Sequence, residues 1–319
     1  MAIARGNSKP WLHDHLNTPT LYSLTVLIWG SSWLAIRFQL GEVAPEVSIA
    51  YRFILASSLL FVWCRIRGIS LQIALPHHPF LALLGLSLFS LNYLLFYYAA
   101  FDLVTGMLAV IFSIMTVMNI FNSAIFLKRK IQKRTMLAVI LGLSGMALVF
   151  WPEISTSSSE AATAIGVSLV ATYLASIGSI ISARNQGHGL PVASANTISM
   201  AYGGLFMLAY SLGSGAPFVI DTSVTYIGSL LLLALFASAI AFGCYLTLVG
   251  RIGPENAAYA TVLFPIVALA LSTWFEDYQW QGRTLAGVSL ILIGNILVLS
   301  RRGLNERIQT LLPKHRKNV

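Results

Sequence analysis

Residues 224–249 read VTYIGSLLLLALFASAIAFGCYLTLV and contain no charged side chain. A helix needs about 20 predominantly apolar residues to cross the hydrocarbon core of a bilayer, so this run is long enough to span a membrane. The composition of the whole chain agrees, because 57% of its 319 residues are hydrophobic and only 10% are charged. So few charges cannot cover the surface of a soluble protein of this length. We therefore expect an integral membrane protein.

Similar apolar runs recur along the chain and predict an all-α integral membrane protein with ten transmembrane helices. They lie at approximately 19–38, 47–64, 79–100, 103–127, 134–151, 163–183, 191–212, 224–249, 254–275 and 284–300. A polar N-terminal tail, 1–18, precedes the first run, which is too long for the apolar part of a cleaved signal peptide. The segment 152–163 is rich in Ser and Thr and predicts a linker outside the membrane. It separates two groups of five helices, 19–151 and 164–300, and a basic tail follows at 301–319.

The positions of the basic residues orient the predicted helices. If the N-terminus is cytoplasmic, every Lys and Arg except Arg37, Arg52 and Arg283 falls in an inside segment. Because inside loops of membrane proteins are enriched in Lys and Arg, both termini are predicted to be cytoplasmic. The formal net charge of +9 is spread over these short inside loops, where contact with anionic membrane lipid accounts for it. We therefore expect no nucleic-acid partner.

The two groups of helices resemble each other in sequence. Laying the segment that begins at Leu103 over the one that begins at Ile252, without a gap, aligns identical residues: Ala109 with Ala258, Ser123 with Ser272, Phe126 with Phe275, and Gly145 with Gly294. Five helices per group is an odd number, so the second group must enter the membrane from the opposite side. Such inverted repeats are typical of secondary transporters, in which the substrate site lies near the membrane midplane between the two halves.

Two groups of motifs resemble the EamA-type members of the drug/metabolite transporter superfamily. They are Ile28-Trp29-Gly30-Ser31-Ser32-Trp33-Leu34-Ala35-Ile36-Arg37 with Tyr51-Arg52-Phe53, and Gly253-Pro254-Glu255-Asn256-Ala257-Ala258 with Leu263-Phe264-Pro265 and Glu276. The resemblance implies ten helices in two inverted five-helix repeats. It also implies export of small metabolites, often amino acids, by alternating access around a central cavity.

The sequence departs from this family pattern at two places. The first half has Thr116 where the second half has Pro265, so we expect the two halves to bend differently. The acidic position that closes the fourth helix in many members is replaced by the basic run Lys128-Arg129-Lys130. Neither change argues against a transporter. Because of both changes, the substrate of any one family member cannot be assigned to this chain.

No predicted helix carries an Asp, Glu or His near its middle. Proton-coupled transporters commonly place such a group in the transport pathway. We therefore favour a facilitator or an exchanger, and proton coupling through Glu276 or Asp102 at the rim is the alternative. The same absence leaves no catalytic residue, metal ligand or cofactor site within the membrane, which argues against an enzyme.

Arg52 is the one charged residue inside a predicted helix, and it has two interpretations. It could extend toward the outer surface and pair with Glu42, Glu46 or a helix C-terminus, which is the interpretation we favour. It could instead contact the anionic group of a substrate, since a cation in hydrocarbon costs at least ~2.5 kcal/mol and is retained mainly for function.

Neutral polar and aromatic side chains near the midplane are the further candidates for substrate contact. They are Trp29, Trp33, Asn92, Tyr93, Tyr97, Asn119, Asn122, Tyr173, Asn196, Tyr202, Tyr245 and Tyr259. For any single residue, hydrogen bonding between helices or ordinary packing is an equally good explanation. Gly30, which permits close helix packing, and Pro265, which frees a carbonyl in the ninth helix, are candidate hinges.

These features favour a bacterial inner-membrane exporter of small metabolites such as amino acids. Efflux of drugs or toxic compounds is the alternative within transport, although cationic drugs generally need a counter-charge that the helices do not offer. A scaffold that transports nothing is the alternative from another class. The sequence leaves open whether the protein is a monomer or a homodimer.

Overall fold

The computed structural model describes residues 16–129, 131, 133–156, 159–258 and 260–294. Over these residues the regular secondary structure is entirely helical. Six stretches among them are helices long and apolar enough to cross a membrane: Pro45–Arg67, Leu75–Ala99, Thr105–Phe126, Ser159–Gly187, Val192–Ser214 and Val224–Ile252. Shorter apolar helices occupy Val139–Val149, Leu263–Phe275 and Gly282–Gly294. The described residues thus confirm the expectation of an all-α membrane protein.

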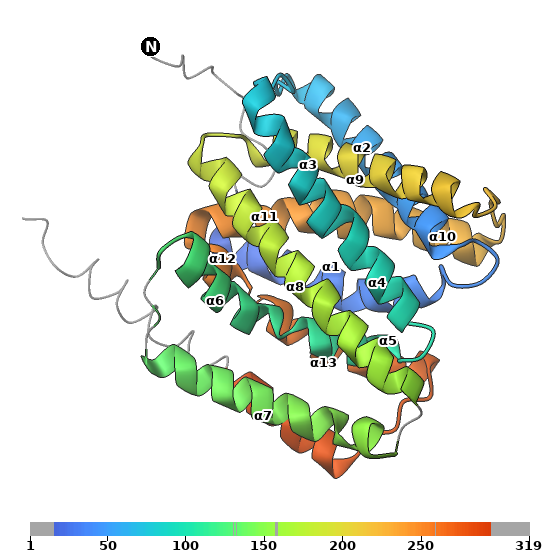
Figure 1. The fold of residues 1–319 in the computed structure, drawn as a ribbon, viewed down its shortest axis with the longest axis vertical. Helices are drawn as coiled ribbons and strands as arrows, with labels where there is room; N and C mark the ends of the chain where they lie inside the picture. Colours follow the sequence, from blue (N-terminus) through green and yellow to red (C-terminus); the bar gives the residue numbers. More distant parts are fainter. Residues whose placement is uncertain (1–15, 130, 132, 157–158, 259, 295–319) are drawn as a thin grey trace, which may run out of the picture.

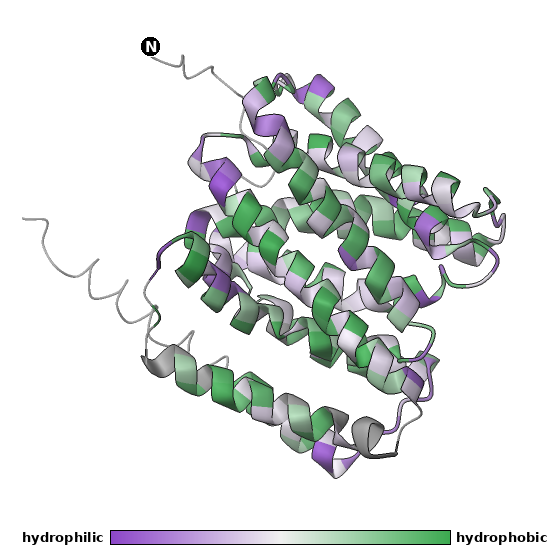
Figure 2. Cartoon of the chain, in the orientation of Figure 1, coloured by the Kyte–Doolittle hydropathy of each residue, from purple (hydrophilic) through white to green (hydrophobic). Residues whose placement is uncertain are grey.

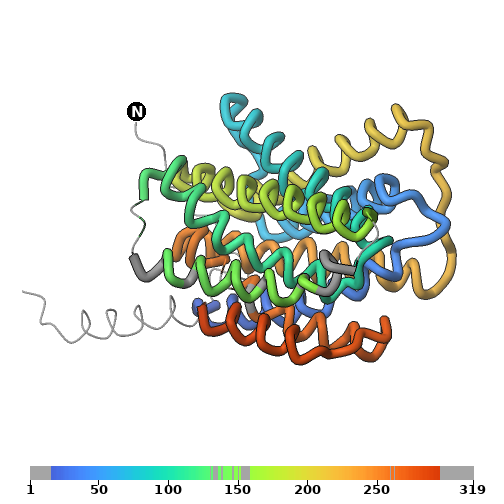
Figure 3. The backbone as a smooth tube through the Cα atoms, turned by 60° about the horizontal axis from the view of Figure 1, so that its bottom comes forward, coloured from blue at the N-terminus to red at the C-terminus, as the bar shows by residue number. Residues whose placement is uncertain are grey.

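Figure 1 shows the order and arrangement of the helices. They are α1 (Thr18–Arg37), α2 (Pro45–Arg67), η1 (Leu75–His77), α3 (His78–Leu86), η2 (Ser87–Leu91), α4 (Asn92–Ala99), α5 (Thr105–Phe112), α6 (Met115–Phe126), α7 (Lys133–Thr156), α8 (Ser159–Gly187), α9 (Val192–Ser214), α10 (Val224–Leu232), η3 (Leu233–Ile240), α11 (Ala241–Ile252), α12 (Pro254–Ala257) and α13 (Ala260–Phe275). The stretch 282–294 is also helical. Figure 3 shows most of these helices running in a similar direction, so that their ends gather at two opposite edges of the molecule.

The described residues of the ten predicted segments are mostly helical, with turns at 113–114 between α5 and α6 and at Ala258 between α12 and α13. Helix α1 is not among the six long apolar stretches. Within the predicted linker 152–163, residues 152–156 are helical and α8 begins at Ser159, and its place outside the membrane stays a prediction. Ser and Thr suit helix ends as well as loops, since their hydroxyls bond exposed backbone groups. The predicted tails 1–18 and 301–319 lie almost wholly outside the described residues.

Two helical stretches change to π-helix near their middle. One is η2, between α3 and α4, and the other is η3, between α10 and α11. A π-helical turn inserts an extra residue, changes the face that later residues present, and loosens the backbone hydrogen bonding. The hydrophobic pattern of the sequence did not predict either segment.

Helix α1 lies inside the bundle. It packs against α13, α11 and α5, while α2 packs against α9, and α4 and α6 pack against α8. A Cβ added at Gly30 of α1 would lie 2.9 Å from the Val267 Cβ of α13, so glycine is needed for this close approach. Helix α7 lies at the edge of the bundle (Figure 1), where Gly145 packs directly against the backbone of Gly287.

The outer surface of the bundle is apolar along the helices. Large hydrophobic side chains are exposed on several of them, including Leu27, Phe61, Ile125, Leu205 and Trp274. Figure 2 shows hydrophilic residues mostly near the helix ends and hydrophobic residues along the helix lengths. This distribution is the one expected of a protein whose sides contact lipid and whose ends contact water.

Candidate functional site

A cavity lies in the centre of the bundle, where helices from both halves of the sequence meet. It is lined by Trp29, Ser32, Trp33 and Ile36 of α1, Arg52 of α2, Leu88 of η2, Asn92, Tyr93 and Phe96 of α4, Phe112 of α5, Phe242 of α11 and Phe264 of α13. The free volume at its centre is about 30 Å³, enough for water-sized contents only. A metabolite can therefore occupy it only if the surrounding helices move apart.

Aromatic rings form the walls of the cavity. The Trp33 ring lies 5.2 Å from the Phe96 ring and 5.7 Å from the Phe112 ring, both edge-on. The Trp29 ring lies 4.7 Å from the Phe242 ring, and its Nε1 donates a 3.0 Å hydrogen bond to the Ala237 carbonyl of η3. The π-helical segment thus supplies the acceptor that holds Trp29 in place. Such walls suit an apolar or aromatic part of a solute.

Arg52 reaches into this cavity instead of toward the surface. Its side chain is 1% exposed, and its Nε donates a 2.9 Å hydrogen bond to Ser238 Oγ. Its guanidinium carbon lies 4.3 Å from the centre of the Tyr93 ring, a cation–π contact. Its Nη1 is buried and has no hydrogen-bond partner. A guanidinium can form charge-assisted hydrogen bonds to an anionic group, so this residue stays a candidate for such a contact.

The favoured interpretation of Arg52 was an anchor extending outward to Glu42, Glu46 or a helix C-terminus, and the structure does not show the pairing with either acid. Among the described residues no ion pair joins Arg52 to either acid. The Glu46 carboxylate accepts instead from Tyr98 Oη at 3.2 Å and Ser214 Oγ at 3.3 Å. Arg52 lies on the face of α2 that points to the inner side of the bundle. There it contacts Ser238 of η3 and Tyr93 of α4.

Asn92 is the second polar group of the cavity with an unused atom. It is the first residue of α4, directly after η2, and its side chain is 3% exposed. Its Oδ1 is buried without a hydrogen-bond partner. Asn92 and Arg52 thus both belong to the wall of this cavity, and each has one buried atom without a hydrogen-bond partner.

Four of the twelve neutral candidates from the sequence line the cavity: Trp29, Trp33, Asn92 and Tyr93. Three others bond between helices: Asn119 Nδ2 donates to the Pro254 carbonyl at 3.0 Å, Asn122 Nδ2 donates to Ser176 Oγ at 2.8 Å, and the Tyr245 hydroxyl lies 3.1 Å from Ser179 Oγ. Tyr202 pairs with His78 Nδ1 at 2.8 Å, away from the cavity.

The remaining neutral candidates do not line the cavity, or fall outside the described residues. Tyr97 and Asn196 are buried but are not part of its wall. Tyr173 is 45% exposed on α8. Tyr259 lies outside the described residues. The candidate hinge Pro265 is a buried residue inside α13, next to Phe264 of the cavity wall.

Sequence reasoning missed seven residues of the cavity wall, and most of them are apolar. They are Ser32, Ile36, Leu88, Phe96, Phe112, Phe242 and Phe264. A phenylalanine in an apolar helix has no feature that separates a cavity wall from ordinary packing. Ser32 and Ile36 lie in the motif of α1, and Phe264 lies beside the candidate hinge Pro265, so these three stood near residues that the sequence had already singled out.

At one end of the cavity, α13 is joined to the start of α5. Glu276 accepts hydrogen bonds from the Thr105 amide at 3.1 Å, the Thr105 hydroxyl at 2.7 Å and the Ser272 hydroxyl at 2.5 Å. Ser272 Oγ also accepts from the Gly106 amide at 2.9 Å. We call these hydrogen bonds among Thr105, Gly106, Ser272 and Glu276 the α5–α13 closure. The closure lies at the end of the bundle that is predicted to face outside. Glu276 and Asp102 also border a polar recess of about 350 Å³ with Arg37.

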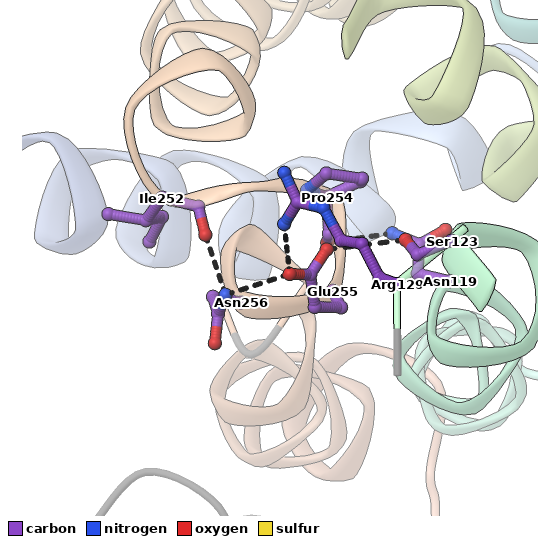
Figure 4. A network of polar contacts seen from close by, with 7 residues as sticks. All are labelled: Asn119, Ser123, Arg129, Ile252, Pro254, Glu255 and Asn256. Atoms are coloured by element: carbon purple, nitrogen blue, oxygen red, sulfur yellow. Dashed lines mark hydrogen bonds and ion pairs between the residues drawn. The ribbon is translucent and has the colours of Figure 1, made fainter. Parts of the chain in front are cut away.

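At the opposite end, α6 is joined to the start of α12 (Figure 4). Arg129 forms an ion pair with Glu255, and Ser123 Oγ donates to the other carboxylate oxygen at 3.2 Å. Asn119 donates to the Pro254 carbonyl, which adds a third link. This group is the α6–α12 closure. The basic run that departs from the family pattern thus contributes Arg129 to a contact between the two halves of the sequence.

A family model described as the EamA-like transporter family matches the chain twice, at residues 20–151 and 162–300. The protein PagO of Salmonella typhimurium is 23% identical over 89% of this chain and 93% of its own length. An uncharacterized inner membrane transporter, YedA of Escherichia coli K12, is 26% identical over 85% of both chains.

A probable amino-acid metabolite efflux pump of Salmonella typhimurium is 24% identical over 85% of this chain and 91% of its own length. One solved crystal structure superposes with a TM-score of 0.70 at 15% identity, and the match covers 89% of this chain and 98% of the other. At that identity the likeness concerns the fold alone.

Proposed function

The chain belongs to the EamA-like transporter family and is a membrane transporter, and we propose that it exports small metabolites such as amino acids across a bacterial inner membrane. Its family and its named relatives are transporters, not enzymes. One relative is described as a probable amino-acid metabolite efflux pump, which supports this substrate class.

The observation that carries the proposal is the position of Arg52. A buried arginine without a carboxylate partner is costly to retain unless a ligand supplies the missing anion, because the Ser238 hydroxyl and the Tyr93 ring replace only part of its hydration. Arg52 is part of the wall of the central cavity, and its buried Nη1 has no hydrogen-bond partner. A substrate carboxylate placed there would form a charge-assisted hydrogen bond, with the apolar remainder of the solute against Trp33 and Phe96.

The proposed architecture is ten transmembrane helices in two inverted five-helix halves, with both termini cytoplasmic. The two matches of the family model, one per half, support this division. So does the similar placement of the two π-helical segments, η2 in the first half and η3 in the second. Ser123 and Ser272, which the internal alignment pairs, take part in closures at opposite ends of the bundle.

Alternating access follows from these two closures. Both are formed in the structure, and the cavity between them is too small for an amino acid. Breaking the α6–α12 closure would open the cavity to the predicted cytoplasmic side, and breaking the α5–α13 closure would open it to the outside. Transport requires that the two open in turn, because opening both would create a leak.

The driving force is proposed to be the substrate gradient, through a facilitator or exchanger. The cavity wall contains no Asp, Glu or His among the described residues, so no lining group can carry a proton in exchange for substrate. Glu276, the rim carboxylate considered for proton coupling, accepts hydrogen bonds from the Thr105 amide, the Thr105 hydroxyl and the Ser272 hydroxyl, and it is not part of the cavity wall. The same lack of a negative group disfavours cationic drugs as substrates.

Reconstitution of the purified protein in liposomes tests this function. Vesicles loaded with unlabelled amino acids should take up labelled amino acid by counterflow, above the rate of empty liposomes. Arg52→Gln should reduce the flux by on the order of tenfold or more, since a charge-assisted hydrogen bond is lost. Arg37→Gln is the matched control, because Arg37 bonds the Ala100 carbonyl outside the cavity and should keep most of the flux. If no amino acid or related metabolite moves, the scaffold interpretation stands.

A further inference from the structure

The connection between α9 and α10, residues 215–223, lies at the end of the bundle that is predicted to face outside. Its sequence is Gly-Ala-Pro-Phe-Val-Ile-Asp-Thr-Ser, so the apolar stretch 216–220 is followed by the polar stretch 221–223. Figure 3 shows this α9–α10 loop at the right-hand edge of the molecule. We propose that its apolar stretch inserts into the headgroup region of the lipid bilayer and holds the α9–α10 pair at a fixed depth. This interaction goes beyond the proposed export function and does not depend on it.

Large apolar side chains of the loop are exposed. Phe218 and Val219 are 42% and 40% exposed, Ile220 is 63% exposed, and Val224, the first residue of α10, is 89% exposed. Single exposed apolar side chains are ordinary, but a group of neighbours in one short loop indicates a contact with something other than water. The ends of membrane-spanning helices usually present polar groups, so this stretch is an exception that needs a partner.

Hydrogen bonds hold the loop in this arrangement. The Ala216 amide donates to the Ser211 carbonyl at 3.0 Å, which ties the start of the loop to α9. The Val219 amide donates to the Pro217 carbonyl at 3.0 Å, and the Tyr51 hydroxyl of α2 donates to the Val219 carbonyl at 3.3 Å. These bonds fasten the loop to α9 and α2, so the exposed side chains are held on the outer surface.

The same bonds lower the cost of moving the loop backbone out of water. An amide without a partner is unfavourable at membrane depth. Within 216–220, the amides of Ala216 and Val219 are bonded and Pro217 has no amide hydrogen, so the amides of Phe218 and Ile220 are left for headgroup oxygens or water. A non-helical backbone with such groups is excluded from the hydrocarbon core, and the headgroup region is the depth that suits it.

Lipid is the partner that fits, because the loop extends a surface that lipid already contacts. Exposed leucines lie along both flanking helices, with Leu205 and Leu212 on α9 and Leu231 on α10. Tyr210, one turn before the end of α9, is also exposed. Tyrosine is enriched at the boundary between membrane and water, so its position marks the headgroup level. The loop continues the apolar surface from this level.

The charges of the loop indicate that insertion is apolar and not electrostatic. Asp221 is its one charged residue, and 215–224 contains no Lys or Arg that could bind an anionic lipid. The Asp221 carboxylate accepts from the Ser223 amide at 2.7 Å, and Ser223 Oγ accepts from the Tyr226 amide at 3.1 Å as the N-cap of α10. The polar stretch thus forms a capped turn suited to water beside the apolar stretch.

Nitroxide labels on single introduced cysteines measure the depth of the loop in a bilayer. Phe218→Cys, Ile220→Cys and Thr222→Cys are compared in the full-length protein in phosphatidylcholine liposomes, with Leu205→Cys as the lipid-facing reference. The unaltered protein, whose free cysteines Cys64 and Cys244 are buried, is the labelling blank. We expect the labels at 218 and 220 to collide severalfold more often with oxygen, which partitions into lipid, than with a water-soluble nickel chelate. The label at 222 should show the reverse.

A charge in the apolar stretch should lift the loop out of the membrane. Ile220→Asp, combined with the label at Phe218→Cys, should raise collisions with the nickel chelate severalfold, because a carboxylate is costly to remove from water. Thr222→Asp is the matched control, since it adds the same charge to the polar stretch of the same loop and should leave the label unchanged. Adding phosphatidylglycerol to the liposomes should also leave it unchanged, because the loop has no basic residue.

Equal access of the nickel chelate to labels at 218, 220 and 222 would overturn the proposal and place the whole loop in water. Labels at 218 and 220 that neither reagent reaches would also overturn it, because a protein partner such as a second copy of the chain would then cover the loop. An unchanged label depth in Ile220→Asp would contradict apolar insertion. These measurements need no substrate, so the absence of amino-acid flux would contradict the proposed function alone.

Discussion

The Nε atom of Arg52 donates a 2.9 Å hydrogen bond to the hydroxyl of Ser238, across the contact between α2 and the π-helical segment η3. The two residues come from opposite halves of the sequence, and both are buried. The bond uses the Nε donor of the guanidinium and holds the side chain on the inner side of the bundle, in the wall of the cavity. Ser238 is therefore a positioning residue for the group proposed to bind the substrate carboxylate.

Replacing Ser238 with alanine should lower the apparent affinity for substrate while leaving the protein folded. Loss of one hydrogen bond to a charged donor costs roughly 1.5–3 kcal/mol, which corresponds to a tenfold or larger rise in KM. Counterflow at varied substrate concentration measures this change. Ser168→Ala is the control, because Ser168 is also buried but bonds only within its own helix, to the Ala164 carbonyl. An unchanged KM in Ser238→Ala would contradict the positioning role.

Arg129→Ala should favour opening of the cavity at the α6–α12 closure. The ion pair with Glu255 is partly exposed, with 46% and 22% of the two side chains accessible. Such pairs contribute only about 0.2–1 kcal/mol, so we expect a shift of a few-fold. Labelling of a cysteine introduced at Ser32 of the cavity, by an impermeant thiol reagent in inside-out vesicles, measures it. Glu42→Gln, an exposed change away from both closures, should leave the labelling rate unchanged.

Glu276→Gln should favour opening at the α5–α13 closure, and by a larger factor. Here a carboxylate accepts from a backbone amide and two hydroxyls, and hydrogen bonds to charged groups are worth about 1.5–3 kcal/mol each. We expect Ser32→Cys labelling from the outside of intact cells to rise on the order of tenfold. A rise from the cytoplasmic side instead would reverse the predicted orientation of the bundle.

Flux should not depend on an imposed pH gradient. The described wall of the cavity has no Asp, Glu or His that could bind and release a proton during the transport cycle. Liposomes with equal substrate on both sides and a gradient of two pH units should therefore show no net substrate movement. Substrate accumulation that follows the pH gradient in the unaltered protein and disappears in Glu276→Gln would contradict the facilitator mechanism. It would support proton coupling through Glu276 at the rim.

Gly85→Ala should destabilise the bundle. A Cβ at Gly85 of α3 would lie 2.5 Å from the Ser199 carbonyl oxygen and 2.9 Å from the Gly203 amide nitrogen of α9, so the two helices would have to separate. Overpacking of this kind costs about 1–3 kcal/mol. A lower Tm of the detergent-solubilised protein measures the effect. Gly166→Ala in α8, where an added Cβ meets no atom within 4 Å, should leave Tm equal or slightly higher.

The cavity divides into residues that sequence reasoning could find and residues that it could not. Trp29, Trp33, Asn92 and Tyr93 stood out because large aromatic or amide groups in an apolar helix need a protein or water neighbour. The same reasoning selected Asn122, whose neighbour is Ser176. The need for a partner is visible in the sequence, but whether that partner is another helix or a substrate is decided by packing.

The amino-acid sequence by itself determined that this protein is helical and lies in a membrane, because hydrophobic length and the scarcity of charge depend only on composition along the chain. Its motifs also identified the family. The tertiary structure decided which face of each helix points inward. The π-helical segments η2 and η3 shift that face in a way that a regular 3.6-residue period cannot anticipate. Arg52 lies on the regular helix α2, and its position at the cavity and away from Glu46 depends on how that helix packs against η3 and α4, which only the folded bundle shows.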